Sequence, residues 1–141
     1  MIWKYTLAWI PMIFIAIVNG TIRQFVYGPW VSELAAHQIS SATAIVLFFL
    51  YTFLLSRRWP LARSSQAWFV GWIWLLLTVA FEFVFGHFVA GHSINRLLQD
   101  YNMAAGRLWP LVLAALFLMP YVTFRIRRPQ KPSKEGFLRL E

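Results

Sequence analysis

The chain has 141 residues, of which 60% are hydrophobic, 18% aromatic and only 13% charged. A soluble domain of this length carries about twice that charged fraction and cannot bury so much apolar surface, so the composition excludes a soluble globular protein and indicates an integral membrane protein. The net charge of +8 comes from cations that flank apolar segments, which argues against nucleic acid as a partner, and the absence of cysteine excludes disulfides and thiolate chemistry.

Four apolar segments follow one another along the chain, each close to the roughly 20 residues that a helix needs to cross a bilayer. Backbone groups in lipid must be hydrogen-bonded within their own segment, so all four are expected to be helical. The sequence therefore predicts an all-α fold, an integral membrane four-helix bundle over residues 1–128. The spans are expected at about 2–20, 30–56, 66–88 and 107–126, and residues 129–141 are expected to form a flexible, basic cytoplasmic tail.

The first span holds Lys4 at its start and lacks an A-x-A cleavage site before Asn19, so we expect it to be retained and not cleaved as a signal peptide. Gly28-Pro29 is typical of a helix start, with Pro29 at the first helical position, and places the beginning of the second span near residue 29.

The loop between the second and third spans predicts the topology. Residues 57–63 contain three arginines and no acid, and the C-terminal tail is more basic still. The positive-inside rule then places both termini in the cytoplasm, and we expect the bacterial inner membrane. Tyr101 and Trp109 are assigned to the aromatic belt on the outer side.

The third span carries a small and polar face. Its members recur at intervals of three or four residues, which puts them on one side of a helix: Gly71, Leu75, Thr78, Glu82 and Gly86. Small residues allow a neighbouring helix to approach, so Glu82 is expected to point into the bundle. It lies about 20 Å from Trp68 along the helix axis, in the outer part of the membrane.

Other polar side chains are predicted to gather at the same outer end. The candidate ligand- or ion-binding residues are Glu82, Arg23, His37, Asn19, Glu33, His87, Asp100 and Arg107. Intramembrane ionisable groups mark functional sites by default, but a buried ion pair that fixes helix register explains Glu82 equally well. We expect Arg23 to be the cationic partner of Glu82, with Arg107 or a histidine as the second choice.

Most of the other candidate residues can also be explained by structural roles. Glu33 is explained by the dipole of a helix that it begins, and His37 by an interfacial position. His87 and His92 are five residues apart, which is poor spacing for two ligands on one helical face. No catalytic residue, metal site or cofactor is predicted, although His37, His87 and His92 are weak metal candidates.

A short helix is predicted along the membrane interface before the last span. Ser93 is suited to cap a helix over residues 94–100. The apolar face of that helix would consist of Ile94, Leu97, Leu98 and Tyr101.

The segments FEFVFGHFVAGHS (residues 81–93) and LLQDYNMAAGRLWPLVL (residues 97–113) resemble a set of small, uncharacterised four-span bacterial membrane proteins. The resemblance covers most of the chain after the first span. It implies a four-span fold and brings no catalytic assignment.

Three classes of function remain open from the sequence. The first is a protein that binds or transports a small solute or ion in an outward-facing polar pocket around Glu82. The second is an accessory or assembly subunit of a membrane complex, and the third, least favoured, is a metal- or haem-binding membrane enzyme. The lipid bilayer is the expected partner, and transport would call for a homo-oligomer because four helices make a thin wall.

Overall fold

The computed structural model describes residues 1–99, 101–102, 104 and 106–127, and every regular element in these residues is helical. In chain order they are α1 (Ile2–Ile22), the π-helical turn η1 (Arg23–Tyr27), the 3₁₀ turn η2 (Gly28–Trp30), α2 (Glu33–Arg58), α3 (Ser64–Val84), the π-helical turn η3 (Phe85–Val89), α4 (Ile94–Gln99) and α5 (Trp109–Arg127). Within this part of the chain, four stretches are long and apolar enough to cross a membrane: Ile2–Trp30, Glu33–Arg58, Ser64–Val89 and Trp109–Arg127. The predicted all-α membrane bundle is confirmed.

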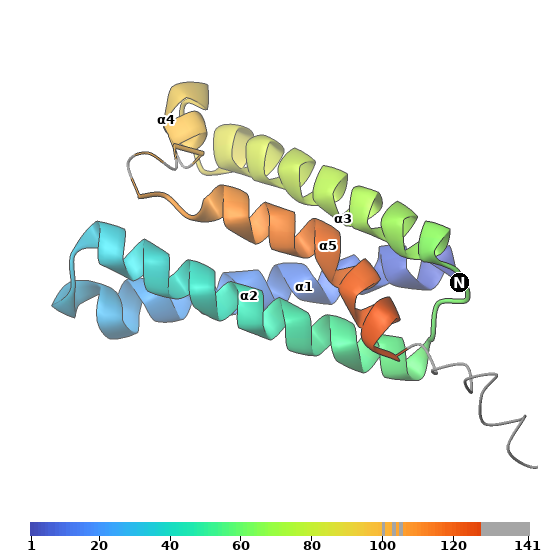
Figure 1. The fold of residues 1–141 in the computed structure, drawn as a ribbon. Coiled ribbons are helices and arrows are strands. Elements are labelled where there is room, and N and C mark those ends of the chain that lie inside the picture. Colours follow the sequence, from blue (N-terminus) through green and yellow to red (C-terminus); the bar gives the residue numbers. More distant parts are fainter. Residues whose placement is uncertain (100, 103, 105, 128–141) are drawn as a thin grey trace, which may run out of the picture.

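The four long helices run up and down in chain order and form a bundle (Figure 1). Around the bundle the order is α1, α2, α5, α3, because α5 packs extensively on both α2 and α3, while α1 packs on α2 and α3. Helices α2 and α3 are therefore diagonal although they are consecutive in sequence. One end of the bundle, near the N-terminus in Figure 1, carries Lys4, Arg57, Arg58, Arg63, Arg125 and Arg127 and is called the basic end. The other, which holds the α1–α2 turn and α4, is called the polar end.

The second span begins later than the sequence predicts. Pro29 lies in the 3₁₀ turn η2, Val31 is extended, and α2 starts only at Glu33. The chain needs these residues to reverse direction between two antiparallel helices. Ser32 then caps α2, since its hydroxyl oxygen accepts a hydrogen bond from the Ala35 amide at 3.1 Å.

The helices expose many large apolar side chains, and several of the side chains that they bury are small or polar. The outward stripe of α1 repeats every three or four residues and consists of Trp3, Leu7, Ile10, Phe14 and Ile17. The inward row of α2 repeats every four residues and consists of Ala36, Ser40, Ala44, Phe48, Thr52 and Ser56. In a soluble bundle the exposed stripe would be polar, so this distribution fits lipid as the surrounding solvent.

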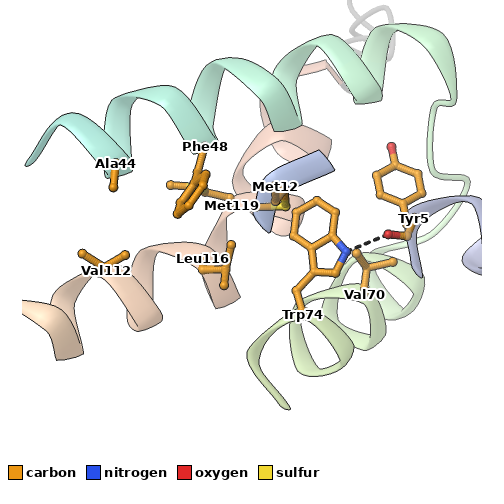
Figure 2. Close-up of a cluster of buried hydrophobic side chains, with 9 residues drawn as sticks. All are labelled: Tyr5, Met12, Ala44, Phe48, Val70, Trp74, Val112, Leu116 and Met119. Atoms are coloured by element: carbon orange, nitrogen blue, oxygen red, sulfur yellow. Dashed lines mark hydrogen bonds between the residues drawn. The ribbon is translucent and has the colours of Figure 1, made fainter. Parts of the chain in front are cut away.

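A cluster of buried hydrophobic side chains joins the four long helices (Figure 2). Part of it, including Tyr5, Val70 and Trp74, lies towards the basic end, and part of it lines the cavity described below. Trp74 is 0% and Tyr5 1% exposed, and the Trp74 indole N–H donates to the Tyr5 carbonyl oxygen at 2.8 Å. The Tyr5 hydroxyl in turn donates to the Trp59 carbonyl oxygen at 2.7 Å. The first bond joins α3 to α1, and the second joins α1 to the residue that follows α2. The diagonal helices α2 and α3 are thus linked through α1.

The small face predicted on the third span is a packing face. Gly71 is buried where α3 meets α5, and a Cβ atom there would collide with the Phe117 carbonyl oxygen. Gly86 is also buried, but its neighbour is α4: an added Cβ would lie 2.8 Å from Leu97 Cδ2. Because glycine has no Cβ atom, α5 can pack closely on α3 at Gly71, and α4 can pack closely at Gly86.

The predicted short helix before the last span is present as α4. Ser93 caps it, because its hydroxyl oxygen accepts from the Arg96 amide at 3.2 Å. Of its expected apolar face, Leu97 is buried against the bundle, while Ile94 and Leu98 are exposed. Asp100 and the predicted tail at 129–141 lie outside the described residues.

Candidate functional site: a cavity at the polar end

A cavity of about 410 Å³ lies between the long helices in the polar half of the bundle. Its inner wall, towards the middle of the bundle, is apolar and includes Met12, Ile13, Phe48, Val112 and Leu116. Its outer part is polar and includes Asn19, Arg23, His37, Ser40, Ser41, Glu82, His92 and Arg107. An apolar enclosure with a few converging polar groups is the usual form of a small-molecule site.

Glu82 faces this cavity from α3 and is held by two aromatic donors. Its Oε2 atom accepts from the Tyr101 hydroxyl at 2.9 Å and from the Trp109 indole N–H at 2.8 Å. Both donors are neutral, and each hydrogen bond to Oε2 stabilises the half-buried carboxylate in this position. Tyr101 and Trp109, assigned from the sequence to the lipid interface, therefore direct their polar atoms inward.

The predicted ion pair between Arg23 and Glu82 is not among the ion pairs that the described residues form. The Arg23 guanidinium instead points to α2, where Nη1 lies 3.5 Å from the Ser40 hydroxyl oxygen. The guanidinium lies close to Gly20, where an added Cβ would be 3.7 Å from Arg23 Nη2, an ordinary contact distance. Arg23 makes no other side-chain hydrogen bond and no ion pair with the described residues.

Asn19 fixes the α1–α2 contact beside Arg23. It is buried, and its Nδ2 donates to the Ser40 carbonyl oxygen at 2.9 Å and to the Ser40 hydroxyl at 3.1 Å. The Ser40 hydroxyl thus accepts from Asn19 of α1 and from Arg23 of η1. Asn19 has its donors engaged by the bundle itself, which gives it a positioning role at the edge of the cavity.

The connection between α4 and α5 is tied across the polar end. Tyr101 and Trp109 bond to Glu82 on α3, and the Gln38 side chain of α2 donates to the Gly106 carbonyl oxygen at 3.0 Å. Gly106 has a φ of 85°, a left-handed conformation that favours glycine. This connection carries Arg107, which lines the cavity and whose guanidinium forms no hydrogen bond or ion pair with the part of the chain described.

The histidines fall into different settings. His37 lines the cavity, with Nε2 4.0 Å from Glu33 Oε1, while the Glu33 side chain is 78% exposed and lies outside the cavity. His87 Nδ1 lies 2.9 Å from the His92 carbonyl oxygen, so His87 closes the turn after η3, and only the His92 side chain lines the cavity. Among the described residues, no three histidine, aspartate or glutamate side chains are grouped to hold a metal ion.

The structure thus brings five of the eight candidate residues to one cavity: Glu82, Arg23, His37, Asn19 and Arg107. Glu33 and His87 do not line it, and Asp100 is not among the described residues. The sequence reasoning missed the hydrogen-bonding roles of Ser40, Gln38, Tyr101 and Trp109. The four-residue spacing of Ala36, Ser40 and Ala44 could have marked Ser40 as buried, because small residues at that spacing favour close helix contacts.

A second hollow of about 740 Å³ lies at the surface of the basic end, between the α2–α3 loop and α5. It shares no lining residue with the first cavity. Its cations are Arg63 and Arg127, which also belong to the membrane-flanking set that predicts topology.

The chain matches no known protein-family model, no curated protein and no solved structure at a significant level. The resemblance to small four-span bacterial membrane proteins accordingly stays a prediction.

Proposed function

We propose that this membrane protein binds a small ligand in the cavity at the polar end. The observation that carries the proposal is the cavity itself, about 410 Å³ with an apolar inner wall and polar groups that converge from α1, α2, α3 and the start of α5. If the polar groups served only to hold the helices together, larger side chains would be expected to fill this space, because protein interiors are closely packed. Instead, α1 and α2 supply Ala16, Gly20, Ser40, Ser41 and Ala44 here.

Binding is better supported than conduction through the bundle. The cavity ends at Trp9, Phe48, Thr78 and Leu116. The next layer towards the basic end consists of Tyr5, Thr52, Trp74 and Met119, each at most 4% exposed. A solute that moves from the cavity towards the basic end therefore meets this packed layer of buried side chains.

The charge distribution favours an outward-facing cavity in a bacterial inner membrane. The described residues of the basic end supply six cations, Lys4, Arg57, Arg58, Arg63, Arg125 and Arg127, and the positive-inside rule assigns such an end to the cytoplasm. Reporter fusions test this orientation: a fusion at Ser64 should give a cytoplasmic signal and one at Asn102 an external signal. The opposite pair of signals would place the cavity on the cytoplasmic side.

Ligand-dependent thermal stabilisation of the purified protein tests the proposed function. Small carboxylates, phosphates, amines, sugars and fatty acids are screened, since a ligand at 100 times its Kd stabilises by about 2.7 kcal/mol. Ala16→Phe should block the effect, because Ala16 is exposed and lines the cavity. Ala42→Phe is the matched control, since Ala42 is an exposed helical alanine that does not line it.

We expect at least one compound class to stabilise the natural protein and Ala42→Phe but not Ala16→Phe. The proposal fails if no class stabilises the protein, or if stabilisation is equal in both variants. A second protein that co-purifies in stoichiometric amount, together with no stabilisation by any compound, would support the assembly-subunit alternative instead.

A further inference from the structure

We propose that the ligand is an anionic amphiphile from the membrane, with one apolar chain and a phosphate or carboxylate headgroup, which enters the cavity sideways between α1 and α3. This inference rests on the proposed function and names the chemistry of the ligand and its route. Charge, depth and the position of the opening each support it.

The charge in the cavity favours an anion. Arg23 and Arg107 both line it, and their guanidinium groups retain unused donors within the described structure, apart from the single 3.5 Å contact of Arg23 with Ser40. Glu82 is the one carboxylate among the described lining residues, and it already accepts from Tyr101 and Trp109. Guanidinium groups are suited to carboxylate and phosphate because their planar donors match the geometry of these anions.

The depth and wall of the cavity favour an apolar chain below that headgroup. On α1 the lining residues run from Arg23 down to Trp9, which is fourteen residues or about 21 Å along a helix. The hydrocarbon core of one leaflet is about 15 Å deep. Below Asn19 the wall is mainly apolar, with Met12, Ile13 and, across the cavity, Leu116. A small hydrophilic anion would leave this wall without a partner.

The exposed residues of the cavity mark a lateral opening. Of its described lining residues, those that are exposed are Ala16 and Ile17 on α1, Phe85 at the start of η3 and Ala90 directly after it. Towards the middle of the membrane the α1–α3 seam is closed, because the Trp9 indole donates to the Thr78 hydroxyl at 3.0 Å and packs edge-on against Phe81. Beyond this contact the two helices present small or apolar side chains on either side of the opening, as a lipid chain would require.

The polar end offers a less direct route. There the α4–α5 connection is tied to α2 through Gln38 and to α3 through Glu82. A lipid-derived ligand does not need to cross this connection, since its headgroup would reach Arg23 and Arg107 from the side.

Thermal stability in dodecyl maltoside tests the inference, because this neutral detergent already supplies a chain of the same length. The probes are dodecyl phosphate, dodecanol, methyl phosphate and dodecyltrimethylammonium, each over a concentration series. We expect dodecyl phosphate to raise Tm and the other three to have little effect. Ala16→Phe should abolish the rise, and Ala42→Phe should retain it.

Two arginine variants assign the headgroup contacts. Arg23→Gln and Arg107→Gln should each weaken the apparent affinity for dodecyl phosphate by about tenfold or more, since each removes charge-assisted donors. Arg96→Gln is the matched control, because Arg96 is an exposed arginine on α4 that does not line the cavity. Two variants are used so that the test survives if one of them does not fold.

The outcomes separate this inference from the proposed function. Equal stabilisation by methyl phosphate, by dodecanol or by the cationic amphiphile would overturn the inference, and so would an equal loss of affinity in Arg96→Gln. If another compound class stabilises the protein through the cavity while dodecyl phosphate does not, the proposed function stands and the inference fails. If no compound stabilises it, both fail.

Discussion

In the basic half of the bundle, three aromatic side chains donate hydrogen bonds to backbone carbonyl groups, whereas in the polar half Trp9, Tyr101 and Trp109 donate to other side chains. The Tyr5 hydroxyl bonds to the Trp59 carbonyl, Tyr51 to that of Ala8 and Trp74 to that of Tyr5, at 2.7, 2.7 and 2.8 Å. Such bonds bring a ring against a neighbouring backbone and leave little space between the helices. The Tyr5 and Trp74 rings also contact one another, with centroids 6.0 Å apart (Figure 2).

In the polar half the donors are again tryptophan and tyrosine side chains, but the acceptors are side-chain oxygen atoms. Trp9 bonds to the Thr78 hydroxyl, and Tyr101 and Trp109 both bond to the Glu82 carboxylate. A side-chain acceptor extends from its own helix, so the backbones stay further apart. Together with small residues such as Gly20 and Ala44, this leaves the cavity. Three aromatic donors are named in each half, so the kind of acceptor, and not the number of donors, distinguishes the closed basic half from the open polar half.

The largest expected effect is in the closed half, for Trp74→Ala. Trp74 is fully buried, so its truncation leaves a void among tightly packed helices and should lower the free energy of unfolding by about 3–5 kcal/mol. Trp72→Ala, on the same helix but 53% exposed, should cost clearly less. Unfolding by SDS in mixed micelles measures both. Equal losses would contradict the assignment of the closed core to this half.

Gly71→Ala should have the next largest effect. The new methyl group would collide with the Phe117 carbonyl oxygen, so α3 and α5 must separate at a cost of about 1–3 kcal/mol. Gly20→Ala is the control in the open half, where the added atom lies no closer than 3.7 Å to Arg23 Nη2, and it should be nearly neutral. A larger loss for Gly20→Ala than for Gly71→Ala in the same titration would reverse the comparison.

Glu82→Gln should have a smaller effect, of about 1–2 kcal/mol. The amide oxygen still accepts from Tyr101 and Trp109, but a neutral acceptor makes weaker bonds than a carboxylate. In a cycle with Trp109→Phe, the double variant should lose less than the sum of the single losses. Glu33→Gln serves as the exposed control and should change stability by at most about 0.5 kcal/mol. Strict additivity would show that the Glu82–Trp109 bond contributes nothing to the polar half.

The sequence predicts the features of this fold that depend on local patterns. Four apolar segments give the four spans, Ser93 caps α4 as expected, and the spacing from Gly71 to Gly86 marks the packing face of α3. Span length, helix caps and helical spacing are decided within a few residues of the chain.

The partners of Glu82 could not be predicted in the same way. Tyr101 reaches it from the α4–α5 connection and Trp109 from the start of α5, and the position of both depends on the order of the helices around the bundle, α1, α2, α5, α3. Arg23 had a matching depth and charge, but the packing of α1 against α2 brings its guanidinium to the Ser40 hydroxyl. Depth can be counted along a helix, whereas the rotation of one helix about its axis relative to another is set by the packing of the whole bundle.

The most direct test of an open polar half and a closed basic half uses the absence of cysteine from the chain. Ser41→Cys and Thr52→Cys place one thiol each on α2, the first in the cavity wall and the second at a position that is 0% exposed. Labelling of the folded protein by N-ethylmaleimide is followed over time, with SDS-unfolded samples as the reference for full reaction. The structure predicts rapid labelling of Ser41→Cys and little labelling of Thr52→Cys until the protein unfolds. Equal rates in the folded protein, or faster labelling of Thr52→Cys, would contradict the account.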